Sequence, residues 1–109
     1  MSLAVEWANN YAKCIDEQRF DDAYNLLDDS FTMKTPKKNC DSKEQWMTEF
    51  VPEAKKGSQP SFEAFEPGDH DKQARRKGSK KVAIVTMSVL QTFDFTDDGK
   101  IKSIVLAKA

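Results

Sequence analysis

The segment from Lys80 to Ala109 constrains the fold of this chain most strongly. It holds two apolar runs, residues 80–95 and 101–109, separated by the loop TDDGK at residues 96–100. An acidic pair followed by glycine is typical of a hairpin loop whose last residue is left-handed. The segment therefore predicts one long β-hairpin. Because such strands twist and are not stable alone, we expect the hairpin to curl around the helices that precede it.

The preceding residues predict three helices. Apolar side chains recur at helical spacing in three segments: 3–17, 20–27 and 43–51. Asp28-Asp29-Ser30 should close the second helix, and overlapping capping boxes over residues 41–45 should start the third. Pro52 should end or kink the third helix, because proline has no amide proton to donate.

Shorter strands are predicted between the helices and the hairpin. Residues 31–35 alternate as a strand does and end at Pro36. Phe62 and Phe65 are expected in a strand that turns at residues 67–69. The charged segment 70–77 fits either a solvated edge strand or a loop.

Pairing across the hairpin loop predicts which side chains share a face. With a three-residue loop, Phe95 faces Ile101 and Asp94 faces Lys102. One face then carries Met87, Val89, Gln91, Phe93, Phe95, Ile101, Ser103 and Val105. The other face carries Ile84, Leu90, Thr92, Ile104 and Leu106. Three helices cover only one side of such a sheet, so the second apolar side predicts a homodimer; a solvated face is the alternative.

The composition narrows the class of protein. A chain of 109 residues fits a single domain, 1–109, and its net charge of −1 gives no field that attracts nucleic acid or a membrane. The N-terminus places Glu6 among its apolar residues and has no basic start, unlike a signal peptide. Cys14 and Cys40 lie in unlike contexts, so we expect free thiols in a cytoplasmic protein, with a disulfide as the alternative.

The order of elements resembles the nuclear transport factor 2-like superfamily, the SnoaL-like and ketosteroid-isomerase-like cone with a cystatin-like α+β fold. The matching stretches are Trp7–Ile15, FDDAYNLLDDSFTM (20–33) followed by Pro36, Ser42–Phe50, and FDFTDDGKI (93–101). The resemblance implies three N-terminal helices packed on a bent antiparallel sheet, a conical cavity, and commonly a dimer through the outer face of the sheet. It implies no single activity, since the superfamily includes isomerases, dehydratases, cyclases and non-catalytic binding proteins.

Two weak catalytic candidates follow. In ketosteroid isomerases a tyrosine of the first helix binds the oxyanion, and an aspartate just before the strand-ending proline is the base. Tyr11 matches that tyrosine, but Thr35 stands at the base position and cannot take a proton at neutral pH. His70, the only histidine, follows a turn beside Asp69 and Asp71, where a solvated histidine is the simpler interpretation.

The remaining cysteine, acidic and basic groups have simpler structural interpretations than catalysis or metal binding. A reactive Cys40 lacks a second histidine as base, and the acidic pairs 28–29 and 97–98 fit turns and caps better than ligands. Neither a metal site nor a cofactor motif is predicted. The basic cluster 75–81 fits a solvated hairpin end, or alternatively the docking site of an acidic protein partner.

An apolar, aromatic interior is predicted where the helices meet the sheet. Its lining would be Trp7, Tyr11, Phe31, Met33, Trp46, Phe50, Met87, Gln91, Phe93 and Ser103. Such a lining suits a pocket for a hydrophobic small molecule, and it equally suits a packed core.

Three functions remain open at this point. The first is a non-catalytic domain that binds a small molecule or a partner and dimerises through its sheet. The second is a cyclase, isomerase or dehydratase acting on a hydrophobic ketone or polyketide-like substrate, and the third is an interaction module using segment 75–81.

Overall fold

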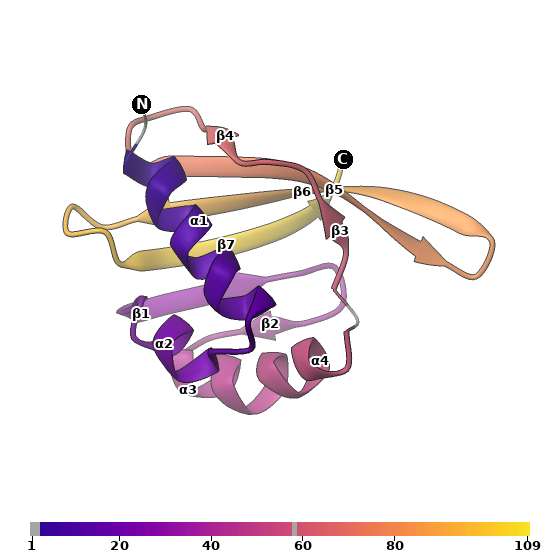
Figure 1. The fold of residues 1–109 in the computed structure, drawn as a ribbon, viewed down its shortest axis with the longest axis horizontal. Helices are drawn as coiled ribbons and strands as arrows, with labels where there is room; N and C mark the ends of the chain where they lie inside the picture. Colours follow the sequence, from indigo (N-terminus) through magenta and orange to yellow (C-terminus); the bar gives the residue numbers. More distant parts are fainter. Residues whose placement is uncertain (1–2, 58) are drawn as a thin grey trace.

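The computed structural model describes residues 3–57 and 59–109, and these form helices packed on one curved sheet (Figure 1). The helical segments are α1 (Leu3–Asp16), α2 (Phe20–Tyr24), α3 (Lys43–Gln45), the π-helix η1 (Trp46–Phe50) and α4 (Val51–Lys55). The strands are β1 (Leu27–Lys34), β2 (Asn39–Cys40), β3 (Ser61–Phe62), β4 (Glu66–Pro67), β5 (Gln73–Val82), β6 (Val85–Phe95) and β7 (Ile101–Lys108). Across the described residues, no helix is long and apolar enough to cross a membrane.

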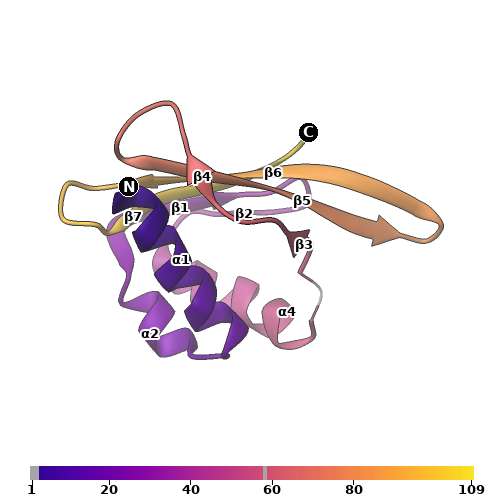
Figure 2. The same ribbon diagram turned by 45° about the horizontal axis from the view of Figure 1, so that its top comes forward.

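All the helices lie on one face of the sheet, which we call the inner face (Figure 2). The strand order is β2-β1-β7-β6-β5-β3, with β4 also paired to β5. The α+β fold with helices packed on a bent sheet is therefore confirmed. The sheet is mixed rather than purely antiparallel, because β1 runs parallel to β7.

An aromatic cluster forms the centre of the core. The ring of Phe93 on β6 lies 5.4 Å from Tyr11 of α1, 5.2 Å from Phe65 and 6.2 Å from Phe95, and Tyr11 in turn lies 6.3 Å from Trp46 of η1. Phe93 and Trp46 are fully buried, and Tyr11 is 2% exposed. Helix, π-helix and sheet are thus joined through the residues with the largest apolar surface to bury.

The predicted hairpin register holds only at its first pair. Phe95 does face Ile101, but Asp94 then faces Ser103 and Phe93 faces Ile104, because the ladder is interrupted at Lys102. Uninterrupted pairing would have buried Ser103 and exposed Ile104. The irregularity leaves Lys102 exposed and Ile104 fully buried, as apolar burial favours.

This register changes the predicted faces of four residues, and a separate turn displaces a fifth, Ile84. Ile104 lies in the core rather than on the outer face, and Leu106 shares the inner side with its partner Gln91. Ser103 and Val105 lie on the outer face, opposite Asp94 and Thr92 respectively. Ile84 lies on neither face of the sheet, because it is in the turn between Val82 and Val85.

The predicted strand 80–95 is wrong, because the chain reverses within it. Residues up to Val82 belong to β5, and Val82 pairs with Val85 across a two-residue turn. Ala83 takes a φ of 56° there, which the sequence does not signal, since neither glycine nor asparagine is present. Ile84 is therefore at the hairpin tip, 94% exposed. Segment 70–77 enters strand β5 from Gln73 onward, so the strand alternative is the correct one.

The remaining boundaries differ modestly from expectation. The second helix ends at Tyr24, and β1 begins at Leu27 because Leu27 pairs with Ile101 and both are buried. Pro52 neither ends nor breaks the helical path. It lies in the first turn of α4, directly after the π-helix, where a missing amide proton is tolerated.

Replacing Phe93 with alanine should destabilise the protein by about 3–5 kcal/mol, because the cavity would lie between α1 and the sheet. Thr92→Ala, on the same strand but the outer face, is the matched control and should cost under about 1 kcal/mol. Urea unfolding measures both. Equal effects of the two substitutions would show that Phe93 does not hold the helices on the sheet.

Candidate functional site

The interior predicted as a pocket is largely filled by its own lining. Of the ten predicted residues, six are buried in the cluster between helices and sheet: Tyr11, Phe31, Met33, Trp46, Gln91 and Phe93. Trp7, Phe50 and Met87 are only partly buried, and Ser103 is on the outer face. The structure thus brings most of the set together as packed side chains. Ser103 lies apart on the outer face, and the prediction for Met87 is wrong as well, because Met87 pairs with Lys80 toward the tip of the β5–β6 hairpin and does not pack against the core cluster.

Tyr11 is placed where the resemblance implied, but its hydroxyl is already engaged. The indole Nε1 of Trp46 donates a hydrogen bond to Tyr11 Oη over 3.3 Å. Burial raises the pKa of the Tyr11 phenol well above its ordinary value of 10.0, so the group holds its proton through the neutral range. Thr35, at the position of the base, closes the turn between β1 and β2, its Oγ1 donating to the Lys38 carbonyl over 2.8 Å.

His70, the second catalytic candidate, lies at the surface and not in the core with Tyr11. It is exposed, and its Nε2 is 3.2 Å from Asp94 Oδ1, while its Nδ1 accepts from the Lys72 amide at 3.2 Å. Asp94 is the partner, rather than Asp69 or Asp71. Tyr11 in the core and His70 at the surface therefore do not form a common site.

The cysteines are free thiols, and both are buried. Burial raises the pKa of the Cys40 thiol, the direction opposite to that of an activated nucleophile. Within residues 3–57 and 59–109, no three His, Cys, Asp or Glu side chains gather as a metal site would require.

A surface pocket of about 290 Å³ lies beside the aromatic cluster, and we call it the Arg76 pocket. Its lining is Ala12, Ile15 and Asp16 of α1, Gln59, Pro60, Ser61 and Phe62 around β3, and Arg76 of β5. Sequence reasoning missed this pocket. The sequence alone presents residues 75–81 as one basic cluster. In the structure, strand alternation places Arg75 on the outer face and Arg76 on the inner face, opposite Gln91.

Arg76 is the chemically distinctive group of this pocket. Its Nε donates to Oε1 of the buried Gln91 over 2.6 Å. Its Cζ lies 3.8 Å from the ring centre of Phe62 and 4.4 Å from that of Phe65, as stacked guanidinium groups do. Burial lowers the pKa of Arg76 to about 10, which leaves the group charged at neutral pH.

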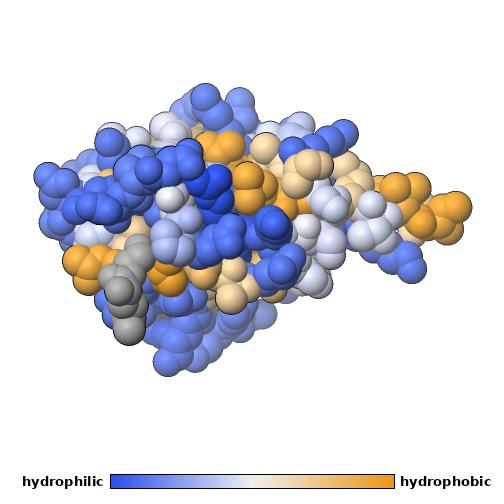
Figure 3. Space-filling view, turned by 90° about the horizontal axis from the view of Figure 1, so that it is seen from above, coloured by the Kyte–Doolittle hydropathy of each residue, from blue (hydrophilic) through white to orange (hydrophobic). Residues whose placement is uncertain are grey.

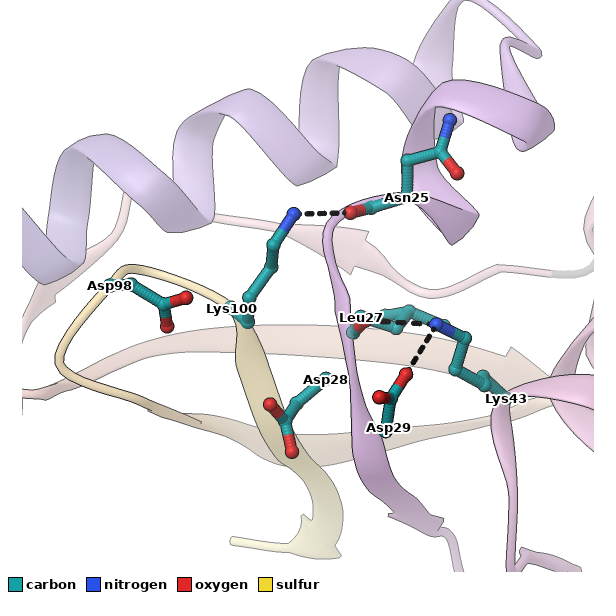
Figure 4. Close-up of a pocket in the computed structure, with 7 residues that line it drawn as sticks. All are labelled: Asn25, Leu27, Asp28, Asp29, Lys43, Asp98 and Lys100. Carbon is teal, nitrogen blue, oxygen red and sulfur yellow. Dashed lines mark hydrogen bonds and ion pairs between the residues drawn. The ribbon is translucent and has the colours of Figure 1, made fainter.

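A second depression is open and polar (Figure 4). It is lined by Asn25, Leu27, Asp28, Asp29, Lys43, Asp98 and Lys100. Two of its cations have partners within the chain: Lys100 Nζ donates to the Asn25 carbonyl at 2.8 Å, and Lys43 Nζ lies 3.2 Å from Asp29 Oδ1. Asp28 accepts from both the amide and the hydroxyl of Ser30. The expected turn at residues 28–30 is wrong, because these residues already belong to β1.

Comparison with known proteins rests on structure alone. No protein-family model matches the chain, and no curated protein sequence is similar to it. Among solved structures, a nuclear transport factor 2-like protein of unknown function from Cytophaga hutchinsonii has a TM-score of 0.72 at 11% identity, covering 100% of this chain and 92% of its own. A second such protein, from Exiguobacterium, has a TM-score of 0.67 at 19% identity, covering 94% and 98%.

The fold is nuclear transport factor 2-like. A putative polyketide cyclase from Sinorhizobium meliloti shares it too, with a TM-score of 0.74, 10% identity and 94% of both chains covered. At these identities the nuclear transport factor 2-like neighbours show the architecture and not a common reaction. Function must be argued from the groups that this chain carries.

Burial of the Tyr11 phenol predicts an alkaline loss of stability. The unfolded chain ionises this group above its ordinary pKa of 10.0, whereas the folded chain does not, so stability is intact below pH 10 and falls as pH rises toward the folded pKa. One pH unit above 10 the loss should reach about 1.4 kcal/mol.

Urea unfolding at neutral and alkaline pH measures this loss of unfolding free energy in the wild type and in two variants. Tyr11→Phe should lack it, and Tyr24→Phe, which leaves Tyr11 in place, should keep it. The same alkaline slope in both variants would contradict a buried, proton-holding Tyr11.

Proposed function

We propose that this chain is a non-catalytic binding domain that takes a small molecule in the Arg76 pocket. The observation that carries the proposal is a charged, ring-stacked guanidinium lining a concave surface beside a filled interior. Binding sites of this kind combine apolar walls with a few positioned polar groups. The pocket combines the apolar groups of Ala12, Ile15, Pro60 and Phe62 with the polar groups of Asp16, Gln59, Ser61 and Arg76.

The chemistry of the pocket supports binding over turnover. A cyclase or isomerase acting on a ketone needs a positioned acid and base. The one carboxylate among the pocket's described lining residues, Asp16, is exposed, and Arg76 stays protonated at neutral pH. Tyr11, the group that the resemblance implied for oxyanion binding, is held by Trp46 inside the core.

We further propose that a second copy covers the outer face of the sheet together with the apolar tip of the β5–β6 hairpin. Leu90 and Thr92 of β6 lie there beside Val105 of β7. The β5–β6 hairpin extends past the helices and ends in an apolar tip, with Val82 45%, Ile84 94% and Val85 58% exposed (Figures 2 and 3). An apolar tip on a projecting arm is a surface that association would bury.

The interaction module remains the competing proposal for the same arm. Arg75 and Lys77 lie on the outer face, and Arg75 pairs with Asp69. Because alternation sends Arg76 to the inner face, segment 75–81 is divided, and an acidic partner would meet only part of it. Charge reversal at Lys77 and Lys81 that leaves self-association intact but abolishes capture of an acidic protein would favour this competing proposal.

A fragment screen followed by amide shifts in NMR tests the binding function. We expect bound fragments to shift the amides of Ile15, Phe62 and Arg76, which come from three different elements around the pocket. The amides of Asp28 and Lys100, at the open polar depression, serve as the internal control. Shifts confined to the control depression, or no shifts from any fragment, would contradict the proposal.

Native mass spectrometry tests the association of two copies. The wild type should give dimers that Ile84→Glu converts to monomers, because a carboxylate at the tip would be buried without a partner. Leu3→Glu is the matched control, since Leu3 is also an exposed apolar residue but lies on α1. A wild type that stays monomeric, or equal loss of dimer in both variants, would end this part of the proposal.

A further inference from the structure

We propose that the Arg76 pocket recognises a planar organic monocarboxylate, with the carboxylate on the Arg76 guanidinium and the apolar part against Ile15, Pro60 and Phe62. This inference rests on the proposed binding function and adds the chemical class of the ligand. It is carried by the state of the Arg76 side chain, which lies against two aromatic rings, donates to Gln91 and makes no ion-pair contact with a carboxylate among the described residues.

The guanidinium lacks an anionic partner within the chain. Among the described residues, no carboxylate lies within ion-pair distance of Arg76, and its one hydrogen bond is to the neutral amide of Gln91. Of its five N–H groups, the Nε donor is used and the four on the terminal nitrogens have no partner among these residues. A partly buried cation without a counter-charge is unfavourable, so an anion that entered would relieve this cost.

The geometry around Arg76 favours a carboxylate in particular. The ring centres of Phe62 and Phe65 lie 3.8 and 4.4 Å from its Cζ, and the buried Gln91 accepts a hydrogen bond from its Nε. These contacts restrict the guanidinium, whose terminal nitrogens form a planar fork. Such a fork matches the two oxygens of a carboxylate in a bidentate pair.

The other lining residues favour a particular hydrocarbon group for the rest of the ligand. The apolar side chains of Ala12, Ile15, Pro60 and Phe62 would contact the hydrocarbon part of such a ligand, while Gln59 and Ser61 line the pocket as further polar groups. A volume of about 290 Å³ is at the small end of ligand pockets, which suits a ligand of one ring.

Asp16 limits the charge of the ligand. Its carboxylate also lines the pocket, and its charge acts on Arg76. A second negative group on the ligand would meet repulsion there, so a monocarboxylate is favoured over a dicarboxylate or a phosphate dianion.

Benzoate and its neutral analogue benzamide provide the direct test, by NMR titration of the whole wild-type chain. Benzoate should shift the Phe62 and Arg76 amides and bind at least about tenfold more tightly than benzamide, because only benzoate can neutralise the fork. Arg76→Gln should remove that preference. Arg75→Gln, the neighbouring arginine on the outer face, is the matched control and should leave it unchanged.

The Asp16→Asn variant provides an independent test, in which the affinity for benzoate should increase and not decrease. Removing the competing charge should tighten benzoate binding while leaving benzamide unaffected. Because the wild-type comparison of the two probes needs no substitution, the test stands even where a variant folds poorly.

The outcomes separate the two proposals. Equal binding of benzoate and benzamide at the pocket would overturn the carboxylate assignment and leave the binding function standing. Binding of neither probe, together with fragments that also fail to bind, would overturn both. Benzoate binding that Arg75→Gln weakens as much as Arg76→Gln would overturn the role of Arg76.

Discussion

The contact between Phe93 and the Tyr11–Trp46 pair is the interaction on which the rest of this structure depends. It joins strand β6, which lies between β5 and β7, to α1 and η1. The rings involved are almost completely buried. A small domain has few large side chains with which to hold its layers together. Here they occupy the space that a conical fold would otherwise leave open. The Arg76 pocket lies at the margin of this packing.

This packing also explains the irregular register of the hairpin. Phe93 can face inward opposite an apolar partner only if β7 presents Ile104 there, and the interruption at Lys102 achieves that. The cost is a local break in the ladder, which is small beside the burial of Ile104 in the core. Side-chain burial, rather than the loop at residues 96–100, sets the register beyond the first pair.

Much of the fold was predictable because it follows from local patterns. Helical spacing over residues 3–17 and the loop ending in Gly99 both appear in the structure, and Gly99 takes the expected positive φ of 87°. The turn at Ala83-Ile84 was not predictable, because the sequence there reads as continuous strand. The break at Lys102 was hidden as well, since it depends on which of Ser103 and Ile104 the helices cover.

The candidate site was less accessible to sequence reasoning than the fold. The sequence predicts Tyr11 and Trp46 as pocket lining, and the structure instead joins them by a hydrogen bond inside the core. Arg76 was read as one member of a basic run. Only the three-dimensional arrangement shows that it alone of its neighbours meets Phe62, Phe65 and Gln91. The sequence leaves segment 70–77 open between an edge strand and a loop, so it does not show that Arg76 faces inward while Arg75 faces outward.

A crystal structure of the protein soaked with benzoate would test the central claim most directly, which is that the aromatic cluster fills the cone and binding occurs at its margin. The account predicts a Phe93 ring packed on Tyr11, with ligand density only beside the Arg76 guanidinium. Ligand density between Tyr11 and Trp46, inside the cone, would contradict it.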